Sequence, residues 1–507
     1  MNPSNASESA ASVPLLCDGR WQVSEADRFE DVFNPSTGQV IGRVPMCGAD
    51  EVARIVEAAA GALPTWSATP AIDRARVLFR LHGLVERSAE QLAQLITREH
   101  GKTLSESRAE VTRGLEMIEF ACGMPSLLMG ENLANIAPGV DAETNRHPVG
   151  VCVGITPYNF PSMVPLWMLP VAIVCGNTFI LKPSEKVPLS AVRIGELLLE
   201  AGLPAGVLSI VHGDRECVDA LLAHPQVTAV SFVGSTNVAR AVFEAGTRQG
   251  KRVQAAGGAK NHLIVMPDAD VELTVKALAA SAYGCSGQRC MAGSVVVAVG
   301  AIGDRLVDRL CAHASQLRVG ATDGASDIDV GPLIRPEHRA RVASYLDVAR
   351  EEGACVALDG RDRFESEAFL LGPSVVDQVQ PEMRLASEEI FGPVLSVIRV
   401  DDIDQAMAVG RACPYGNGAS IFTRDGAAAR RFKHEFNAGM IGINVGVPAP
   451  MAWFPFTGWN RSFFGDLHIQ GREGMLFYTR QKTSLTRWFH SPSESHHDPV
   501  WKSAPGK

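Results

Sequence analysis

Short apolar segments that alternate with amphipathic helical segments constrain the fold of this chain more than any other feature. Between residues 149 and 258, strand-like runs such as VGVCVGIT, NTFILKPS and AVSFVGS alternate with helix-like runs such as AVRIGELLLEAG and NVARAVFEAG. A second alternating stretch runs from Asn261 to about Asn444. Neighbouring parallel strands need long crossover connections, which helices usually supply. The pattern therefore predicts an α/β protein with two doubly wound parallel-sheet domains and a boundary near Gly258.

The region before the first alternation has helical periodicity. From Asp50 to about Met129, apolar residues recur at three- and four-residue spacing, as on one face of amphipathic helices. Farther on, eighteen uncharged residues from Val164 to Leu181 are interrupted by Pro165 and Pro170, whereas a bilayer span needs about 20 mostly apolar residues. We expect a buried helix followed by a buried strand there, and no membrane partner.

Composition argues against some partners and compartments. The 507 residues contain 47 Lys plus Arg against 56 Asp plus Glu, for a formal net charge of -9, whereas binding to a nucleic-acid backbone needs a basic face. Nucleic acid is therefore not expected as a partner. The eleven cysteines are odd in number and scattered, unlike a disulfide framework, and the N-terminus has neither a secretory nor a transit pattern. We expect a cytoplasmic protein with reduced thiols.

The two ends of the chain are polar. The first fifteen or so residues are rich in Ser, Ala and Asn, and we expect them to be disordered. The tail after Ser491 is expected to be either mobile or an arm onto a neighbouring subunit. Within it, His496 and His497 are more simply solvated side chains than metal ligands. With no H-E-x-x-H helix in the sequence either, no metal site is expected.

The sequence lacks the usual phosphate-binding motifs. Gly416 and Gly418 begin a G-x-G-x-x-G pattern, but Ile421 stands where the third glycine belongs, and no G-x-x-x-x-G-K-[ST] loop is present. A nucleotide site, if there is one, must therefore be built in another way.

Cys290, in GCSGQRCMAG, is a candidate nucleophile. A lone cysteine is usually a small buried apolar residue, but Gly284 and Gly287 allow the backbone close to a substrate and Arg289 adds a positive charge that favours the thiolate. Cys285, five residues before Cys290, is either a second redox-sensitive thiol or, more simply, a packing residue.

Further candidates follow strands of the first alternating region. Asn159, in TPYNFP, is either a turn or helix-cap residue or an amide donor to a developing oxyanion. Lys182 and Glu185, in LKPSE, follow the strand NTFIL, and ligands of open α/β sheets bind at the carboxyl ends of strands. Ser235 opens a helix, where it either caps the helix or places the helix N-terminus against a pyrophosphate.

Taken together these segments resemble the aldehyde dehydrogenase superfamily, in order and over nearly the whole chain. The segments that carry the resemblance are GVCVGITPYNFP, TFILKPSE, SFVGST, GQRC, EEIFGPV, CPYGNG and GREG. The resemblance implies a fold with an NAD-binding domain (residues 1–128 and 149–258), a catalytic domain (259–475), and an oligomerisation arm and tail (129–148 and 476–507). It also implies a homo-oligomer, a dimer or tetramer.

The resemblance assigns roles to individual residues. Cys290 is similar to the nucleophile that attacks the aldehyde carbonyl, and Asn159 with the backbone N–H of Cys290 is similar to the oxyanion hole. Residues similar to the family's NAD contacts are Thr156, Tyr158, Lys182, Glu185, Lys186, Ser235, Gly257, Glu389 and Phe391. Among these, Glu185 would repel a 2′-phosphate, which favours NAD over NADP.

One departure from the family pattern concerns deacylation. Hydrolytic members carry E-L-G-G-K, with the glutamate activating water, whereas alignment on Gly258 and Lys260 places Ala256 at the glutamate position. Without that carboxylate the sequence offers no evident base for water. A thiol acceptor needs less help, since a pKa of about 8.5 leaves a few per cent thiolate near neutrality. We therefore expect coenzyme A as co-substrate.

Longer segments resemble the methylmalonate-semialdehyde dehydrogenase branch: GKRVQAAGGAKNH, GQRCMA, CPYGNGASIFT and PFTGWNRSFFGDLHIQGREGMLFYTRQK. That branch oxidises methylmalonate or malonate semialdehyde with NAD and CoA, with loss of CO2, to propanoyl-CoA or acetyl-CoA. Arg289 and Arg113 match its carboxylate-binding arginines, and guanidinium suits that role; a helix-surface ion pair is the alternative for Arg113. The loop NVGVPAPMAWFPF is expected to line the substrate entrance. The alternative functions are a non-acylating aldehyde dehydrogenase that releases free acid and a catalytically silent NAD-binding paralogue.

Overall fold

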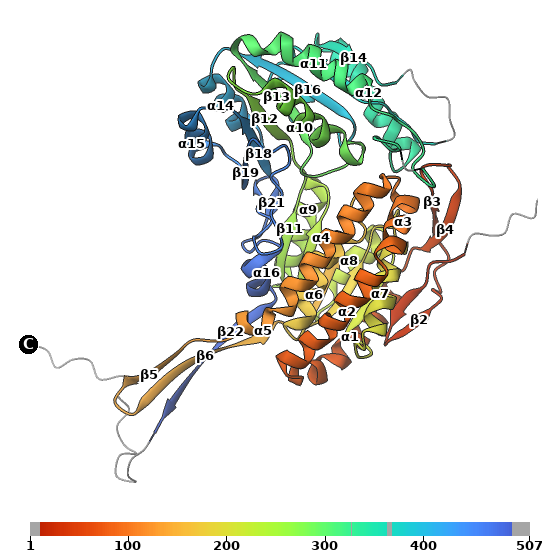
Figure 1. Ribbon diagram of the computed structural model, residues 1–507. Helices are drawn as coiled ribbons and strands as arrows, with labels where there is room; N and C mark the ends of the chain where they lie inside the picture. The colour runs from red at the N-terminus through yellow and green to blue at the C-terminus, as the bar shows by residue number, and fades with distance from the viewer. Residues whose placement is uncertain (1–10, 326, 362–367, 489–507) are drawn as a thin grey trace, which may run out of the picture.

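A computed structural model describes residues 11–325, 327–361 and 368–488. It consists of two α/β bodies, each built on its own sheet, and a slender arm that leaves the lower body (Figure 1). The predicted fold class is thereby confirmed, as is the helical region between Asp50 and Met129. The residue boundaries of the domains stay a prediction.

The first sheet has eight strands in the order β2-β1-β9-β8-β7-β10-β11-β21, and its five central strands are parallel. Its strands are β1 (Leu15–Cys17), β2 (Arg20–Gln22), β7 (Val151–Ile155), β8 (Thr178–Lys182), β9 (Leu208–Ile210), β10 (Val227–Val233), β11 (Arg252–Ala256) and β21 (Phe463–Phe464). The chain runs from β7 outward through β8 and β9, then returns to β10 beside β7 and continues to β11. The carboxyl ends of β7 and β10 therefore flank the point where strand order reverses, which is where open α/β sheets bind ligands.

Helices cover both faces of this sheet. The helices of this body are α1 (Ala49–Ala68), α2 (Ala71–Arg87), α3 (Ala89–His100), α4 (Leu104–Cys122), α5 (Met124–Leu127), α6 (Met163–Val174), α7 (Leu189–Glu200), α8 (Arg215–Ala223), α9 (Thr236–Arg248) and α16 (Gly471–Phe477). Alternate residues of β7 point to opposite faces: Val151 and Val153 pack with α1, α8 and α9, and Cys152 packs with α2, α4, α6 and α7. The apolar segment from Val164 to Leu181 forms the buried helix α6 and most of the buried strand β8, as predicted.

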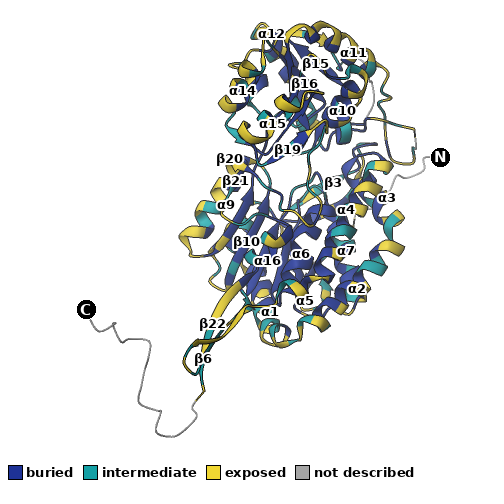
Figure 2. Cartoon of the chain, turned by 60° about the vertical axis from the view of Figure 1, so that its left-hand side comes forward, coloured by how far each residue is buried: buried dark blue, intermediate teal, exposed yellow. Residues whose placement is uncertain are grey.

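The second sheet has seven strands in the order β14-β15-β16-β13-β12-β18-β19, antiparallel only at β14. Its strands are β12 (Asn261–Val265), β13 (Gly293–Val299), β14 (Cys355–Leu358), β15 (Ser374–Asp377), β16 (Val394–Val400), β18 (Gly418–Phe422) and β19 (Met440–Ile443). Its helices are α10 (Val271–Tyr283), α11 (Gly303–Ser315), α12 (Pro336–Glu351), α13 (Arg384–Ser387), α14 (Ile403–Ala412) and α15 (Gly426–Glu435), with the short 3-10 turns η1 (Gly284–Gly287) and η2 (Gly300–Ile302). Two apolar clusters fill its faces, one under α10 and α11 and the other under α12, α14 and α15. In Figure 2, the dark blue interior of each body consists of that body's own sheet and the helix faces packed on it.

Four residues, 257–260, connect the carboxyl end of β11 to the amino end of β12. This short connection sets the carboxyl ends of the first sheet against the amino ends of the second. Loops that precede strands of the second sheet therefore face loops that follow strands of the first.

The arm is a three-stranded antiparallel sheet in the order β22-β6-β5. Its strands are β5 (Asn132–Ala137), β6 (Val140–Pro148) and β22 (Thr479–Arg487). It is mostly yellow or teal in Figure 2, because β5 is exposed along nearly its whole length. Two further strand pairs are small: β3 (Phe29–Phe33) with β4 (Val40–Pro45), and β17 (Tyr415–Gly416) with β20 (Trp459–Asn460).

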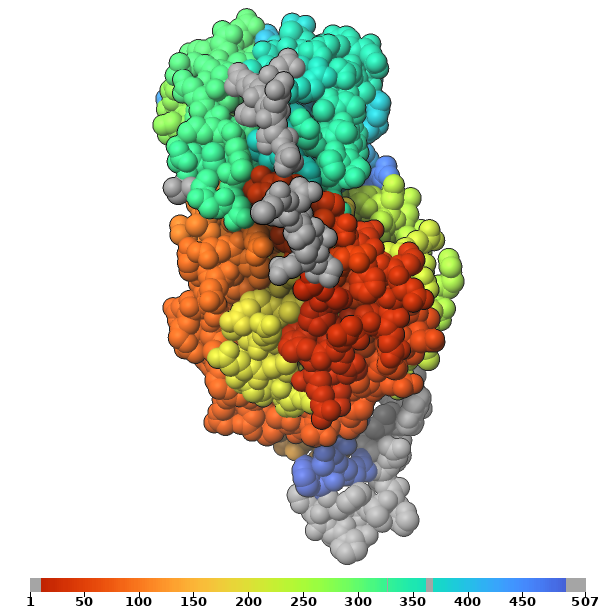
Figure 3. Space-filling view, turned by 90° about the vertical axis from the view of Figure 1, so that its right-hand side faces the viewer, coloured from red at the N-terminus to blue at the C-terminus, as the bar shows by residue number. Residues whose placement is uncertain are grey.

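The N-terminal segment lies along the first body and reaches the second (Figure 3). The side chain of Ser36 contacts that of Thr322 at 3.0 Å, and Phe33 packs edge-on to Phe369. The prediction of disorder for the first fifteen residues is wrong for residues 11–15. There Val13 is buried and its N–H donates to Arg43 O at 2.8 Å, so this stretch is held as part of the fold.

Predictions for residues 1–10 and for the tail after Ser491, with His496 and His497, concern residues outside those that the structure describes. Within the described ranges, no helix combines the length and apolar character needed to cross a membrane.

Candidate active site

Cys290 lies three residues before β13, in the space between the two sheets. Its carbonyl oxygen accepts hydrogen bonds from Asn261 Nδ2 at 2.8 Å and Asn417 Nδ2 at 3.1 Å. Its own backbone N–H and that of Met291 point to the thiol. The Cys290 carbonyl is thus fixed by the first residue of β12 and by the residue just before β18.

The thiol of Cys290 shares a pocket with Glu389, Arg289, Asn261 and Phe391. Burial, followed by the charge of Glu389, raises the pKa of Cys290 to about 12, although the two backbone N–H groups and Arg289 act in the opposite direction. Arg289 thus acts on the Cys290 pKa in the predicted direction, but its effect is smaller than that of burial. Desolvation of a thiolate outweighs one neighbouring cation here.

The reason lies in the direction of the Arg289 side chain. Its guanidinium donates to Glu106 Oε1 at 3.2 Å and to Ala280 O at 3.4 Å. A β-carbon at Gly284 would meet the same guanidinium at 2.6 Å, so the absent side chain of Gly284 makes room for it. Arg289 thus lines the pocket of Cys290 while its charge is balanced by α4.

The segment before Cys290 is a strained turn. Cys285 and Ser286 have φ values of 49° and 54°, in the left-handed region that non-glycine residues rarely adopt. Hydrogen bonds hold this conformation: Cys285 N donates to Glu106 Oε1 at 2.6 Å, and Ser286 Oγ donates to Gly331 O at 2.7 Å. Cys285 is buried and burial raises the pKa of its thiol, which supports the packing alternative over a redox-sensitive thiol.

Asn159 follows β7 and reaches across to the second sheet. Its Nδ2 donates to Gln288 O at 3.0 Å, two residues before Cys290. The helix-cap alternative is wrong, because Ser162 occupies the N-cap position of α6. A carboxamide has two N–H donors, so the one bond to Gln288 leaves the second for a substrate oxygen.

Lys182 and Glu185, two of the predicted NAD contacts, lie where β8 ends. Lys182 Nζ is 3.4 Å from Glu185 Oε2. Burial alone would raise the pKa of Glu185, but the charges of Lys182 and Lys186 outweigh it and hold that pKa below its ordinary value. Thr156, after β7, donates its backbone N–H to Lys182 O at 3.1 Å. The two strand ends are therefore joined at the reversal point of the sheet.

Ser235 occupies the N-cap position of α9 and its side chain makes no capping hydrogen bond. It is exposed, directly after β10. Beside it, Thr236 Oγ1 accepts the N–H of Gly258 at 2.8 Å, and Gly257 donates to Ser462 O at 2.8 Å. The helix N-terminus with an unengaged serine hydroxyl is suited to a phosphate group.

Glu389 lies in the loop before β16, and its Oε1 accepts the N–H of Ala259 at 2.9 Å. A β-carbon at Gly258 would stand 2.2 Å from Glu389 Oε2, so a side chain at position 258 would displace the carboxylate from this position. Burial raises the pKa of Glu389 to about 7. Of the described residues that line the Cys290 pocket, Glu389 alone is acidic.

Aromatic residues close the side of the crevice near Glu389. The ring of Phe391 lies 5.9 Å from that of Tyr158 in a T-shaped contact, and Lys186 Nζ lies 5.0 Å from the Tyr158 ring centre. Three predicted cofactor contacts from two different sheets thus lie together.

Ala256 is the last residue of β11 and is buried. It lies opposite Val233 on β10 and Phe463 on β21. The position where hydrolytic members carry a glutamate is therefore occupied by a methyl group between two strands.

Arg113 lies on α4, and its side chain is partly exposed. Its Nη1 donates to Glu116 Oε2 at 2.9 Å, which is the ion pair of the alternative interpretation, and to Met451 Sδ at 2.6 Å. Phe120 of α4 also packs edge-on to Trp453. Arg113 therefore borders the loop that was predicted to line the substrate entrance.

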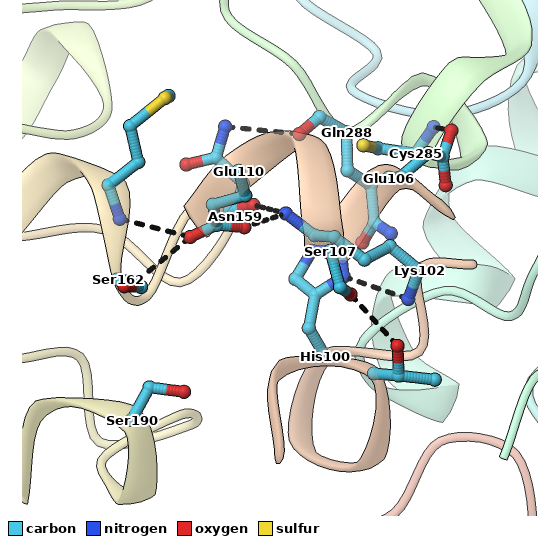
Figure 4. A network of polar contacts seen from close by, with 12 residues as sticks. His100, Lys102, Glu106, Ser107, Glu110, Asn159, Ser162, Ser190, Cys285 and Gln288 are labelled. Atoms are coloured by element: carbon cyan, nitrogen blue, oxygen red, sulfur yellow. Dashed lines mark hydrogen bonds and ion pairs between the residues drawn. The ribbon is translucent and has the colours of Figure 1, made fainter. Parts of the chain in front are cut away.

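Three charged residues of the site were not found from the sequence: Lys102, Glu106 and Glu110 (Figure 4). Glu106 carried a signal, since T-x-x-E at Thr103 predicts a capping box, and the structure has that box at the start of α4. Lys102 and Glu110 carried none, because charged residues in a helical region usually face solvent. Within the described ranges, no group of His, Cys, Asp or Glu is arranged to hold a metal ion.

Comparisons with known proteins extend this description. The sequence model described as "Aldehyde dehydrogenase family" matches residues 21–484. Malonate-semialdehyde dehydrogenase 1 of Geobacillus kaustophilus is 50% identical over 473 residues, 93% of this chain and 96% of that protein. Malonate-semialdehyde dehydrogenase of Pseudomonas aeruginosa is 48% identical over 480 residues, 94% and 96% of the two chains.

Solved structures agree in fold. Methylmalonate-semialdehyde dehydrogenase from Oceanimonas doudoroffii superposes with a TM-score of 0.93 at 47% identity, covering 95% of this chain and 99% of the other. A protein from Sinorhizobium meliloti 1021, described as a methylmalonate-semialdehyde dehydrogenase and solved with NAD, gives 0.94 at 43% identity, with coverage of 96% and 100%.

Proposed function

The chain belongs to the aldehyde dehydrogenase family, and on that premise we propose that it oxidises malonate or methylmalonate semialdehyde with NAD and CoA. CO2 is lost, and the product is acetyl-CoA or propanoyl-CoA. The observation that carries this proposal is Ala256: the chain keeps a cysteine and an amide donor but has a methyl group at the position of the hydrolytic glutamate. Relatives described as malonate-semialdehyde dehydrogenases, at 48 to 50% identity, support the substrate class.

The crevice between the sheets fits NAD. Lys182 and Glu185 stand at the end of β8, where the ribose of a dinucleotide is expected, and the N-terminus of α9 with Ser235 suits the pyrophosphate. The Glu389 carboxylate, which lies against Gly258, suits the nicotinamide ribose, since a carboxylate accepts hydrogen bonds from hydroxyl groups. When bound, NAD supplies the acceptor for the hydride of the aldehyde carbon.

The acylation step uses Cys290 and Asn159. As its thiolate, the Cys290 sulfur forms a bond to the aldehyde carbon, and the carbonyl oxygen takes the electron pair of the broken π bond. The second N–H of Asn159 Nδ2 and the backbone N–H of Cys290 stabilise that oxyanion, a contribution worth about 10² to 10³ in rate per donor. The carbonyl re-forms as the hydride leaves, and a thioester on Cys290 remains.

Deacylation then depends on the acceptor. A CoA thiolate attacks the thioester carbonyl and Cys290 leaves as thiolate, so no water has to be activated. Glu389 lies in the same pocket with a pKa of about 7, which supports one alternative. In that alternative Glu389 is a general base for water, and the enzyme releases free acid.

Two arginines are proposed to bind the substrate carboxylate. Arg113 borders the entrance loop and Arg289 lines the pocket of Cys290. Arg289 already donates to Glu106 and Ala280, whereas among the described residues the hydrogen-bond partners of Arg113 are confined to its Nη1. This difference favours Arg113 as the main contact.

The test is NADH formation from malonate and methylmalonate semialdehyde, with and without CoA, and identification of the product by mass. Acetyl-CoA or propanoyl-CoA formed only with CoA is the expected result. Sustained turnover to free acid without CoA would establish the hydrolytic alternative, and Glu389→Gln would then be the variant to examine. NADH formation from neither substrate would favour the catalytically silent paralogue.

We also propose that the protein is a cytoplasmic homo-oligomer. Its eleven cysteines are all free thiols, in keeping with a reducing compartment. The outer strand β5 leaves Leu133 and Ile136 more than half exposed, and Leu485 on β22 is 61% exposed. An unpaired strand edge with apolar side chains is a template for a second copy of the chain.

A further inference from the structure

A buried ion pair lies directly behind the loop that carries Asn159. The side chains of Lys102 and Glu110 are both 0% exposed, and Lys102 Nζ is 2.5 Å from Glu110 Oε2. Lys102 comes from the connection between α3 and α4, and Glu110 from the second turn of α4. Burial of two charges is costly unless further hydrogen bonds satisfy them, so the remaining partners of the pair indicate what it holds.

Those remaining partners are backbone groups of the loop between β7 and α6. Lys102 Nζ donates to Asn159 O at 2.7 Å, and Glu110 Oε1 accepts the N–H groups of Ser162 at 2.9 Å and Met163 at 3.1 Å. Figure 4 shows the lysine nitrogen between the glutamate and the Asn159 backbone. The loop is therefore held at Asn159 by the cation and at the start of α6 by the anion.

The remaining face of the ammonium group is also occupied. Lys102 Nζ lies 4.0 Å from the ring centre of Phe160, the residue after Asn159. A cation and an aromatic face attract each other, more strongly when desolvated. The carboxylate, the Asn159 carbonyl and the Phe160 ring thus fix the position of the nitrogen and, with it, the backbone at residue 159.

The other end of Asn159 meets the segment of the nucleophile. Its Nδ2 donates to Gln288 O, and Gln288 is two residues before Cys290. A shift of the Asn159 backbone would therefore move the amide relative to the sulfur. A misplacement of about 1 Å at a reacting centre can cost about 10²-fold in rate.

We propose that Lys102 and Glu110 are positioning residues that hold the Asn159 amide in place for attack by Cys290. Neither side chain touches the reacting atoms; both act through the backbone of the β7–α6 loop. The inference rests on the proposed function, in which Asn159 stabilises the oxyanion of the acylation step.

The test is a double-mutant cycle between Lys102→Met and Asn159→Ala, read as single-turnover NADH formation from malonate semialdehyde without CoA. Lys102→Met keeps most of the side-chain volume and removes the donors. We expect it to slow the single turnover about 10- to 100-fold in the wild-type background. In the Asn159→Ala background it should change the rate less than about twofold, because no amide is left to position.

Two further variants separate positioning from folding. Glu110→Gln keeps an oxygen acceptor for Ser162 and Met163 but loses the ion pair, so it should show the same non-additivity even where Lys102→Met folds poorly. Arg108→Met, which removes an exposed cation of α4 paired with Glu90, should leave the single turnover unchanged. Melting temperature and NAD affinity are measured for every variant.

Equal slowing by Lys102→Met in both backgrounds would overturn the inference, since a general structural defect does not depend on Asn159. An unchanged rate in the wild-type background would overturn it too. If Asn159→Ala alone leaves the rate unchanged, the Asn159 amide does not contribute to the acylation step, and the inference is overturned. Absence of NADH from wild-type enzyme would instead show failure of the proposed function.

Discussion

The thiol of Cys290 should be unreactive in the protein without cofactor. With a pKa of about 12, about one thiol in 10⁴ is ionised at pH 8, against about one in four for an unperturbed thiol of pKa about 8.5. Thiolate nucleophilicity rises with pKa, with a Brønsted coefficient of about 0.4 to 0.5, which recovers about 40-fold. Alkylation of Cys290 should therefore be slower than that of an exposed cysteine by a factor on the order of 10².

Iodoacetamide labelling followed by peptide mass spectrometry measures this rate. Trypsin cleaves after Arg289, so Cys285 and Cys290 fall on different peptides, and the exposed Cys355 is an internal reference. The labelling rate of Cys290 should keep rising with pH well past neutrality, until the pH nears the pKa of about 12.

The contribution of Glu389 can be separated in the same assay. Glu389→Gln removes the like charge that raises the pKa of Cys290, an effect of about one unit. Labelling should accelerate about three- to tenfold at pH 8. At pH 6 the difference should vanish, because Glu389 is protonated below its pKa of about 7. Labelling of Cys290 as fast as Cys355 at pH 8, or no effect of the substitution there, would refute this reasoning.

Three other predictions concern specificity, stability and assembly. Arg113→Leu should raise KM for malonate semialdehyde at least about tenfold and for propanal little; equal effects in steady-state kinetics would remove Arg113 from the substrate site. Glu99 is buried and accepts hydrogen bonds from Leu189 and Ser190, and burial raises its pKa to about 7. Because this folded-state pKa exceeds that of the unfolded chain, the free energy of unfolding of the wild type should rise by about 3 kcal/mol relative to that of Glu99→Gln as pH falls from 7 to 4.5. Urea unfolding that gives the same difference in free energy between the two proteins at both pH values would contradict this. Leu133→Asp should shift the oligomer toward smaller species in light scattering; an unchanged mass would place the interface elsewhere.

Periodicity predicted most of the fold because each central strand and helix is long enough to carry it. The segment from Val164 to Leu181 lacks such periodicity, since every residue of α6 is buried. It was divided into a helix and a strand because Pro165, Pro170, Gly176 and Asn177 interrupt it. The two-residue strand β21 has no periodicity, and nothing in its sequence indicates that it pairs with β11 of the first sheet. Short edge strands of this kind are determined by tertiary packing alone.

Site residues were predictable where a strand end or a family motif marked them, but the pairing of buried charges was not. Arg289 precedes Cys290 in the chain, yet its charge is balanced by Glu106, 183 residues away in sequence. From the sequence alone, Lys102 and Glu110 resemble solvated residues of a helical region, but both are among the most buried charges of the described residues. Pairing of buried charges is a long-range property, so sequence adjacency gives a poor estimate of which charge acts on which group.

The geometry of the two sheets explains why a single residue can redirect the chemistry. Residues 257–260 place the carboxyl ends of the first sheet against the amino ends of the second, so residue 256 lies close to the junction where the two sheets meet. Acylation needs only groups that lie on either side of this junction, namely Asn159 and Cys290. Position 256 ends β11 at the junction itself, where a carboxylate would add a base for water and a methyl group adds none. The thioester on Cys290 is then left to an acceptor that ionises unaided near neutral pH, and a thiol meets that requirement far better than water.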